Sequence, residues 1–261
     1  MALLGTTLPQ FRSSAEPAIE VARQAEAAGL DGVFVFDHLW PLGQPRQPAL
    51  HALPLLGALV AETDSLVVGT LVARVSVLPD PVLVDALVTV RQLAGERFIA
   101  GLGTGDRHNR DENVTHGVPY PAPEARLARL ADCCDRLRHA GVTTWVGGLS
   151  GDVRRLAAAK ADGWNGWGVE PDRFASMAAC LRDQAGPAFR LSWGGQVLIG
   201  RTASEAAEKL RRHGTRPGLF HGTVADWRQH LDRLTDAGAD WVVAAPIDVG
   251  AGPGAIELLA P

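Results

Sequence analysis

The feature that most constrains the fold of this 261-residue sequence is an alternation of short apolar segments with longer amphipathic ones. The apolar segments have the length of strands, and the amphipathic segments have the period of helices. An order of strand, helix, strand is typical of a parallel sheet whose faces are covered by helices. We predict eight strands, over residues 2–6, 32–36, 66–73, 98–103, 142–148, 163–168, 191–200 and 240–246.

Eight repeats of this kind match the size and order of a single α/β barrel. The helices between the strands are predicted at 14–28, 48–62, 82–94, 124–140, 152–161, 172–185, 203–213 and 224–237. An open doubly wound sheet is the alternative, but eight repeats favour closure into a (β/α)8 TIM barrel. No linker or change in composition separates the repeats, so we expect one domain over residues 1–261.

Composition and charge narrow the class of partner. The 25 Lys and Arg residues against 29 Asp and Glu residues give a formal net charge of −4. This balance argues against binding to nucleic acid or to an anionic membrane surface. No apolar run approaches the roughly 18 residues of a membrane span, and the first residues lack the positive segment of a signal peptide. The three cysteines show no CxxC spacing. We therefore expect a cytoplasmic protein with reduced thiols that acts on a small molecule.

Barrels of this kind carry their chemistry in the loops that follow the carboxyl ends of the strands. His38 is the strongest candidate there, because the second predicted strand runs through Asp37 directly into it. An imidazole at this place could donate or accept a proton near neutral pH, although a histidine without catalytic duty fits the same position. None of the other histidines has the spacing of zinc ligands, so no metal site is predicted.

Two glycine-rich turns follow other strands. Residues 103–106, Gly-Thr-Gly-Asp, would let backbone N–H groups approach an anion or a flat ring. The following segment, RHNRDEN, has the composition of a solvated loop. Gly147 and Gly148 precede Ser150 and a predicted helix, whose N-terminus would favour a phosphate. A tight turn and a simple helix cap are the alternatives. One or two of the seven tryptophans are expected to wall a planar ligand, and most to pack in the core or at its rim.

Taken together, five segments resemble the bacterial luciferase-like flavin-dependent monooxygenase family, particularly its branch that uses the deazaflavin coenzyme F420. The resemblance runs through nearly the whole chain in the order of the family. It is specific as a combination, whereas each segment alone is not. The segments are GLDGVFVFDHLWP (29–41), GTLVARVSVLPDP (69–81), GERFIAGLGTGDRHNRDEN (95–113), VGGLSGDVRRLAAAKADGWNGWG (146–168) and GTVADWRQHLDRLTDAGADWVVAAP (222–246).

The resemblance implies a role for each matching residue after the second and third strands. His38 matches the residue beside the deazaflavin ring that assists hydride transfer, and Asp37 matches a cofactor contact. Leu71 and Val72 match a non-prolyl cis peptide bond whose bulge backs the ring. Ala73 falls on a further position that contacts the cofactor.

The resemblance also assigns the later turns. Asp106 falls where the sugar-phosphate dehydrogenases of the family place a glutamate acid, and Asn109 falls on a polar cofactor contact. Gly147, Gly148 and Ser150 match the loop that receives the tail and the phosphate of the cofactor. Similar proteins are usually dimers, so the resemblance implies a homodimer.

Three departures from the family pattern accompany these matches. Asp106 is one methylene shorter than the glutamate, and Leu42 stands where those dehydrogenases carry a tryptophan that packs on the ring. The predicted helix at 124–140 leads straight into the fifth strand, where many members insert a hairpin or a lid. The chain therefore resembles a shortened member with reduced insertions, and its pocket is expected to be more open or covered by another subunit.

The leading hypothesis is an F420-dependent oxidoreductase that transfers a hydride between the deazaflavin and a small organic substrate. The runner-up keeps the fold but uses reduced FMN and O2 as a monooxygenase. A third interpretation is a flavin-binding member without turnover. A phosphate-binding aldolase or isomerase comes last, because it needs a lysine in the site, and Lys160 and Lys209 both lie on predicted helices.

Overall fold

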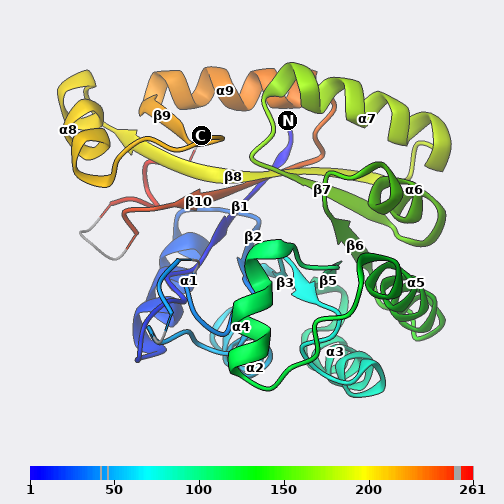
Figure 1. Ribbon diagram of the computed structural model, residues 1–261. Helices are drawn as coiled ribbons and strands as arrows, with labels where there is room; N and C mark the ends of the chain where they lie inside the picture. The colour runs from blue at the N-terminus through cyan, green and yellow to red at the C-terminus, as the bar shows by residue number, and fades with distance from the viewer. Residues whose placement is uncertain (42, 46, 250–253, 261) are drawn as a thin grey trace.

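The computed structural model describes residues 1–41, 43–45, 47–249 and 254–260. Eight parallel strands form a ring: β1 (Leu3–Thr7), β2 (Gly32–Val35), β3 (Val67–Thr70), β5 (Phe98–Gly103), β6 (Thr144–Gly147), β7 (Gly163–Trp167), β8 (Arg190–Gly200) and β10 (Trp241–Pro246). The ring closes because β10 pairs with both β1 and β8. Two short strands lie outside it: β4 (Ala73–Arg74) pairs with β5, and β9 (Phe220–Thr223) pairs with β8. The predicted TIM barrel is confirmed (Figure 1).

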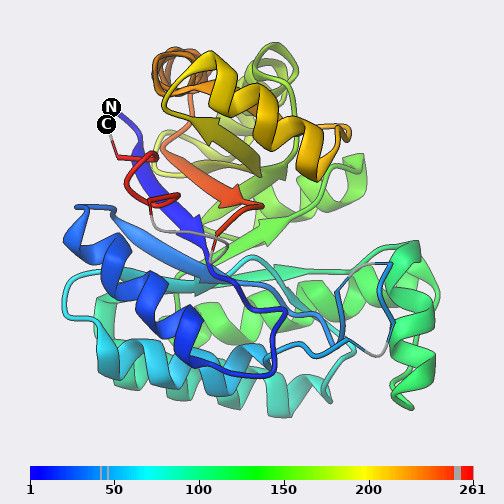
Figure 2. The same cartoon turned by 90° about the vertical axis from the view of Figure 1, so that its left-hand side faces the viewer.

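Helices cover the outside of this ring (Figures 1 and 2). They are α1 (Glu16–Ala27), α2 (Ala52–Glu62), α3 (Asp80–Ala94), α5 (Pro123–His139), α6 (Gly151–Lys160), α7 (Pro171–Ala185), α8 (Ala203–His213) and α9 (Val224–Asp236). Three shorter helices lie between these elements: η1 (Gly95–Arg97), η2 (Arg107–Asn109) and α4 (Arg110–Thr115). Among the helices of the described residues, none is long and apolar enough to cross a membrane.

The inside of the barrel is filled by aromatic rings that lie opposite glycines. The rings of Phe34, Trp145 and Trp241 are buried, and the centroids of each pair are 5.8 Å apart. A Cβ on Gly163 would come within 2.7 Å of Trp145, and one on Gly32 within 3.2 Å of Trp241. Each indole thus occupies space that a neighbouring strand leaves free by having no side chain. The interior is a packed core, which confines ligand chemistry to the loops at the ends of the strands.

The structure differs from the prediction at three places. The strand predicted over 66–73 is two strands, β3 and β4, separated by Leu71 and Val72. The prediction lacks β9, because its sequence FHGT shows no apolar alternation and none of its residues is fully buried. The polar segment after β5, predicted as a solvated loop, forms η2 and α4 instead.

Candidate functional site

Two predicted site segments meet at the carboxyl end of the barrel. His38 follows β2 and Val72 follows β3, and these strands pair in parallel with Val35 opposite Thr70. The N–H of Leu71 donates to the carbonyl of Val35 at 2.8 Å, which ties the two strand ends together. The Leu71–Val72 peptide bond is cis, as the resemblance predicts. The structure therefore brings His38 and Val72 to the same mouth of the barrel, on neighbouring strands.

Three glycines of β5 and β6 receive the side chain of Val72. A Cβ on Gly103 would lie 2.6 Å from a Val72 methyl group, one on Gly147 would lie 2.8 Å away, and one on Gly101 would lie 3.3 Å away. The glycines at 103 and 147 are expected from the sequence to leave room for a ligand. In the structure, the group that approaches them closely is a valine of the same chain. Val72 remains partly exposed above this seat.

Aromatic side chains line the mouth next to Val72. The ring centroids of Phe36 and Trp167 are 5.6 Å apart, and the ring centroid of Phe11 lies 6.1 Å from that of Phe36 and 6.0 Å from that of His38. Phe36 and Trp167 are partly exposed, and Phe11 is one of the large apolar residues that solvent reaches. Of the tryptophans, Trp167 is thus the one whose ring lies beside the mouth and Phe36. Such a wall suits one face of a planar ligand.

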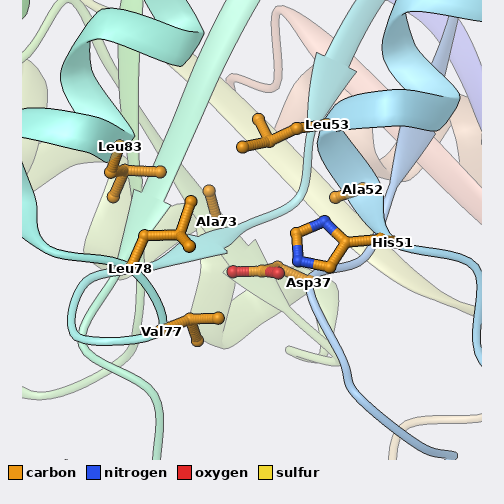
Figure 3. Close-up of a pocket in the computed structure, with 8 residues that line it drawn as sticks. All are labelled: Asp37, His51, Ala52, Leu53, Ala73, Val77, Leu78 and Leu83. Atoms are coloured by element: carbon orange, nitrogen blue, oxygen red, sulfur yellow. The ribbon is translucent and has the colours of Figure 1, made fainter. Parts of the chain in front are cut away.

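Asp37 lies behind the mouth rather than in it. Its carboxylate is buried and accepts the backbone N–H of Arg74 at 2.8 Å, while Nε of Arg74 donates to the carbonyl of Asp37 at 2.7 Å. Burial raises the pKa of the Asp37 carboxyl, and the bond from Arg74 opposes this effect. Figure 3 shows the carboxylate facing the imidazole of His51 in a small cavity between α2 and α3. Ala73, which is fully buried, lines the same cavity.

A buried glutamate of α4, Glu112, reaches His38 from the other side. Its Oε2 lies 3.4 Å from Nδ1 of His38 and accepts Nδ2 of Asn109 at 3.1 Å. Its Oε1 accepts the backbone N–H of Leu39 and lies 3.1 Å from Nη2 of Arg74. The side chain of Glu112 is 0% exposed, whereas that of His38 is 18% exposed.

The contacts of Glu112 keep it ionised. Burial alone raises the pKa of its carboxyl group, because the charged form loses its hydration. The hydrogen bond with His38, the charge of Arg74 and the N–H of Leu39 outweigh burial and lower the pKa to about 2. A negative charge therefore stands beside the His38 ring at every pH near neutrality.

Asp106 and Asn109 shape the loop after β5. The carboxylate of Asp106 accepts the N–H of His108 at 2.8 Å, and Oδ1 of Asn109 accepts the N–H of Asp106 at 2.9 Å, so the two residues form a capping box for η2. Asp106 is exposed and Asn109 is buried. Nη1 of Arg126 donates to the carbonyls of residues 104 and 105 at 2.8 and 2.9 Å, which fastens the start of this loop to α5.

The turn between β6 and α6 is also held by the protein itself. Gly148 has φ of +144° and accepts Nε1 of Trp164 at 2.7 Å through its carbonyl. The Oγ of Ser150 accepts the N–H of Val153 at 3.3 Å and caps α6. Gly147 and Gly148 are partly exposed and Ser150 is exposed. This turn follows the carboxyl end of β6, so it belongs to the same mouth.

Sequence reasoning missed the buried polar cluster at this mouth. The composition of RHNRDEN predicts a solvated loop around the candidate Asn109, which is wrong for Glu112 and Asn113, because they are buried together with Asn109. Their spacing at i, i+3 and i+4 is that of one helix face, and this was the signal available in the sequence. Arg74 stands among the strand-end residues but pairs with a carboxylate that only the fold brings near. Leu42 lies outside the residues that the structure describes.

Comparison with known proteins decides the family. A family model described as luciferase-like monooxygenase matches residues 4–141, more than half of the chain. The chain belongs to this family. The resemblance of its sequence motifs is thereby confirmed, and the fold of this luciferase-like protein agrees with it.

Curated relatives match parts of this luciferase-like protein. An F420-dependent glucose-6-phosphate dehydrogenase of Nakamurella multipartita is 34% identical over 114 residues, which is 43% of this chain and 33% of that protein. The enzyme of the same name from Beutenbergia cavernae is 38% identical over 109 residues, which is 41% of this chain and 32% of that protein. The aligned part thus spans about a third of the length of these relatives.

Solved structures share the fold over nearly the whole chain. An F420-dependent secondary alcohol dehydrogenase in complex with an F420–acetone adduct has a TM-score of 0.81 at 14% identity, and the match covers 99% of this chain and 96% of that one. The coenzyme F420-dependent tetrahydromethanopterin reductase of Methanopyrus kandleri has a TM-score of 0.76 at 13% identity, covering 99% and 97%. A long-chain alkane monooxygenase matches with a TM-score of 0.77 at 14% identity, covering 100% and 90%. At these identities the likeness shows the fold alone.

Proposed function

We propose that this luciferase-like protein is an F420-dependent oxidoreductase, acting as one domain over residues 1–261, that transfers a hydride between the deazaflavin and a small organic substrate. The observation that carries the proposal is the placement of His38 and Val72 after the carboxyl ends of two paired strands, above a closed aromatic core. The curated relatives named as F420-dependent dehydrogenases support the choice of cofactor.

The residues at the mouth suit a planar ring with an anionic tail. Val72, Phe36 and Trp167 offer a partly exposed apolar surface for the ring. On the β6 side, Gly147 and Gly148 leave no side chains in the way, and the N-terminus of α6 at Ser150 favours negative charge. The bound deazaflavin would supply the hydride chemistry, and the protein supplies orientation and electrostatics.

Within this proposal, His38 handles the proton. Among the described residues, Nε2 of His38 has no hydrogen-bond partner, so it is available to a substrate oxygen at the mouth. The backbone of Leu71–Val72 would support the ring, and Gly147, Gly148 and Ser150 would receive the tail.

Four other predicted site residues keep the mouth in shape. Asp37 and Ala73 border the cavity behind it, and Asp106 and Asn109 hold the loop above it. The Asp106 carboxylate caps η2, and His38 alone would carry the proton.

Titration of the purified protein with F420 and with FMN tests this proposal. We expect roughly micromolar binding of F420, and reduction or oxidation of the bound cofactor by a small alcohol or carbonyl compound. His38→Ala should retain binding and lose turnover. Tight binding of FMN with O2-dependent product would favour the monooxygenase. Binding without any hydride exchange would favour a member without turnover, and binding of neither cofactor would refute both functions.

We also propose that the protein is a homodimer joined through α2 and α3. Helix α2 carries only one charged residue, Glu62, and exposes Pro54 and Ala61 on its outer side. On α3, Val82 is 51% exposed and Leu93 is 62% exposed. Apolar surface of this kind is typical of an interface. Sedimentation velocity should give twice the 27.6 kDa of the chain, and Leu93→Arg should shift it to monomer; a wild-type monomer would refute the dimer.

A further inference from the structure

Glu112 is a buried carboxylate within 3.4 Å of the proposed proton-handling group, although hydride transfer does not call for a second acid at this place. It comes from α4, 74 residues after His38. Its burial is complete, and its Oε2 lies 3.4 Å from Nδ1 of His38. A glutamate is rarely buried in this way unless its contacts compensate for the lost hydration. The contacts that hold Glu112 in this buried place therefore also determine which group faces Nδ1 of His38.

We infer that Glu112 is a positioning residue that fixes the tautomer of His38, with the proton on Nδ1 and the lone pair of Nε2 directed to the mouth. The inference rests on the proposed function for its catalytic meaning, but it concerns a feature of the protein without cofactor. A neutral imidazole carries its proton on one nitrogen, and the hydrogen bond of that nitrogen selects which one.

The carboxylate of Glu112 can only accept hydrogen bonds. It is ionised and accepts from the N–H of Leu39 and Nδ2 of Asn109, and the guanidinium of Arg74 pairs with it as a cation. A bare Nδ1 lone pair facing Oε2 would be a contact between two acceptors in a buried place. The arrangement is favourable only if Nδ1 of His38 donates, and Nε2 is then the acceptor.

Two aromatic rings flank the His38 imidazole at the mouth. The ring centroid of Phe11 lies 6.0 Å from that of His38 with an interplanar angle of 61°, and the ring centroid of Phe36 lies 6.3 Å away with an interplanar angle of 58°. Turning the ring over would replace the N–H beside Glu112 with a C–H and remove the bond. The side chain is 18% exposed, so part of the ring remains open to solvent.

The loop that carries Glu112 is itself anchored. Nη1 of Arg74 donates to Oδ1 of Asn113 at 2.9 Å, and Nδ2 of Asn113 donates to the carbonyl of Pro119 at 3.0 Å. Arg126 holds the start of the loop through two backbone carbonyls. The carboxylate is thus placed by rigid contacts, as a positioning group needs to be.

The direct test is nitrogen-15 NMR of the histidine rings in the protein without cofactor, at a pH where the rings are neutral. His38→Ala identifies the signals of this ring among those of the eight histidines. We expect His38 in the wild type to be mainly the Nδ1–H tautomer. A mainly Nε2–H ring in the wild type overturns the inference, and this outcome needs no variant to fold.

Glu112→Gln keeps the size of the side chain and reverses the hydrogen bond. Because the N–H of Leu39 and the charge of Arg74 favour the oxygen on their side, the amide NH2 would face His38 and donate to Nδ1, at the loss of the bond from Nδ2 of Asn109, so the ring should switch to the Nε2–H tautomer. The matched control is Glu26→Gln, since Glu26 also accepts backbone N–H groups, at residues 64 and 65, but far from the mouth. The control should leave the His38 signals unchanged. An unchanged tautomer in folded Glu112→Gln overturns the inference.

The same variant separates this inference from the proposed function. If F420 binds, Glu112→Gln should bind it with unchanged affinity, and kcat should fall by roughly 10²-fold or more, as expected for loss of general acid–base catalysis. If F420 does not bind but the wild-type ring is the Nδ1–H tautomer, the proposed function fails and the positioning role stands. If F420 is turned over by the wild type and Glu112→Gln retains full kcat, the positioning role fails and the function stands.

Discussion

The fit of Val72 against glycine can be tested by a double-mutant cycle. Gly103→Ala places a methyl group 2.6 Å from a methyl of Val72, whereas its other neighbours, the Gly147 carbonyl and Cβ of Val72, lie at 3.5 and 3.7 Å. Only the Val72 methyl groups thus stand in the way. Overpacking of this kind costs about 1–3 kcal/mol. Removing a glycine from the unfolded chain offsets about 0.4–1 kcal/mol of that cost.

Val72→Ala alone removes two methyl groups at about 0.8 kcal/mol each and so should cost at most about 1.6 kcal/mol. In the Val72→Ala background the obstacle to Gly103→Ala is gone, so the second substitution should stabilise the protein slightly. The coupling energy between the two sites should be about 1–3 kcal/mol, within the range for residues in contact. Urea unfolding of the four proteins measures it.

Gly101→Ala is the matched control for this cycle. A Cβ there would also approach Val72, at 3.3 Å, but the backbone carbonyl of Thr70 lies closer and cannot move aside. Gly101→Ala should therefore destabilise the protein equally in both backgrounds. If Gly103→Ala and Val72→Ala prove additive, the account of how the glycines seat this valine is wrong.

Three further predictions concern stability and thiol reactivity. Burial lowers the pKa of His230 to about 4, whereas the histidine of the unfolded chain has its ordinary pKa of 6.5. The unfolded chain therefore binds more protons between these values, and the free energy of unfolding should fall by up to about 3 kcal/mol from pH 6.5 to 4. Urea titrations of His230→Phe should show a weaker dependence on pH, and an unchanged dependence would contradict this prediction. Burial raises the pKa of Cys133 and Cys134 to about 12. A thiol reagent at pH 8 should therefore modify only the exposed Cys180 until the protein unfolds, and reaction of all three cysteines in the native state would contradict this prediction. Gln10→Ala should lower the free energy of unfolding by about 1–3 kcal/mol in thermal unfolding, because the buried amide of Gln10 bonds to the backbone of Phe36, after β2, at 2.6 and 2.8 Å. An unchanged free energy of unfolding would contradict this prediction.

The barrel could be predicted from the sequence because its signal is repeated and local. Each strand and helix carries its own apolar period, and the order of elements leaves few ways to close a sheet. His38 could be placed at the mouth for the same reason, since a residue directly after a strand must lie at its carboxyl end. The cis bond between Leu71 and Val72 came from the family resemblance rather than from any local pattern.

The buried cluster could not be predicted in the same way, because its partners are far apart in the chain. Glu112 looks like a surface residue until Arg74 of β4 and His38, which follows β2, approach it. Likewise, the number of tryptophans and glycines is visible in the sequence, but the pairing of Trp145 with Gly163 depends on the register between neighbouring strands. Contacts of this kind arise from tertiary structure, which outweighs local preference.

A crystal structure of the protein soaked with F420 tests the central claim most directly. The account predicts that the deazaflavin ring lies against the Leu71–Val72 backbone with the His38 imidazole beside it, and that the tail runs toward Ser150. A ring bound away from these residues, for instance in the cavity beside His51, or a mouth that stays empty at saturating F420, would contradict it.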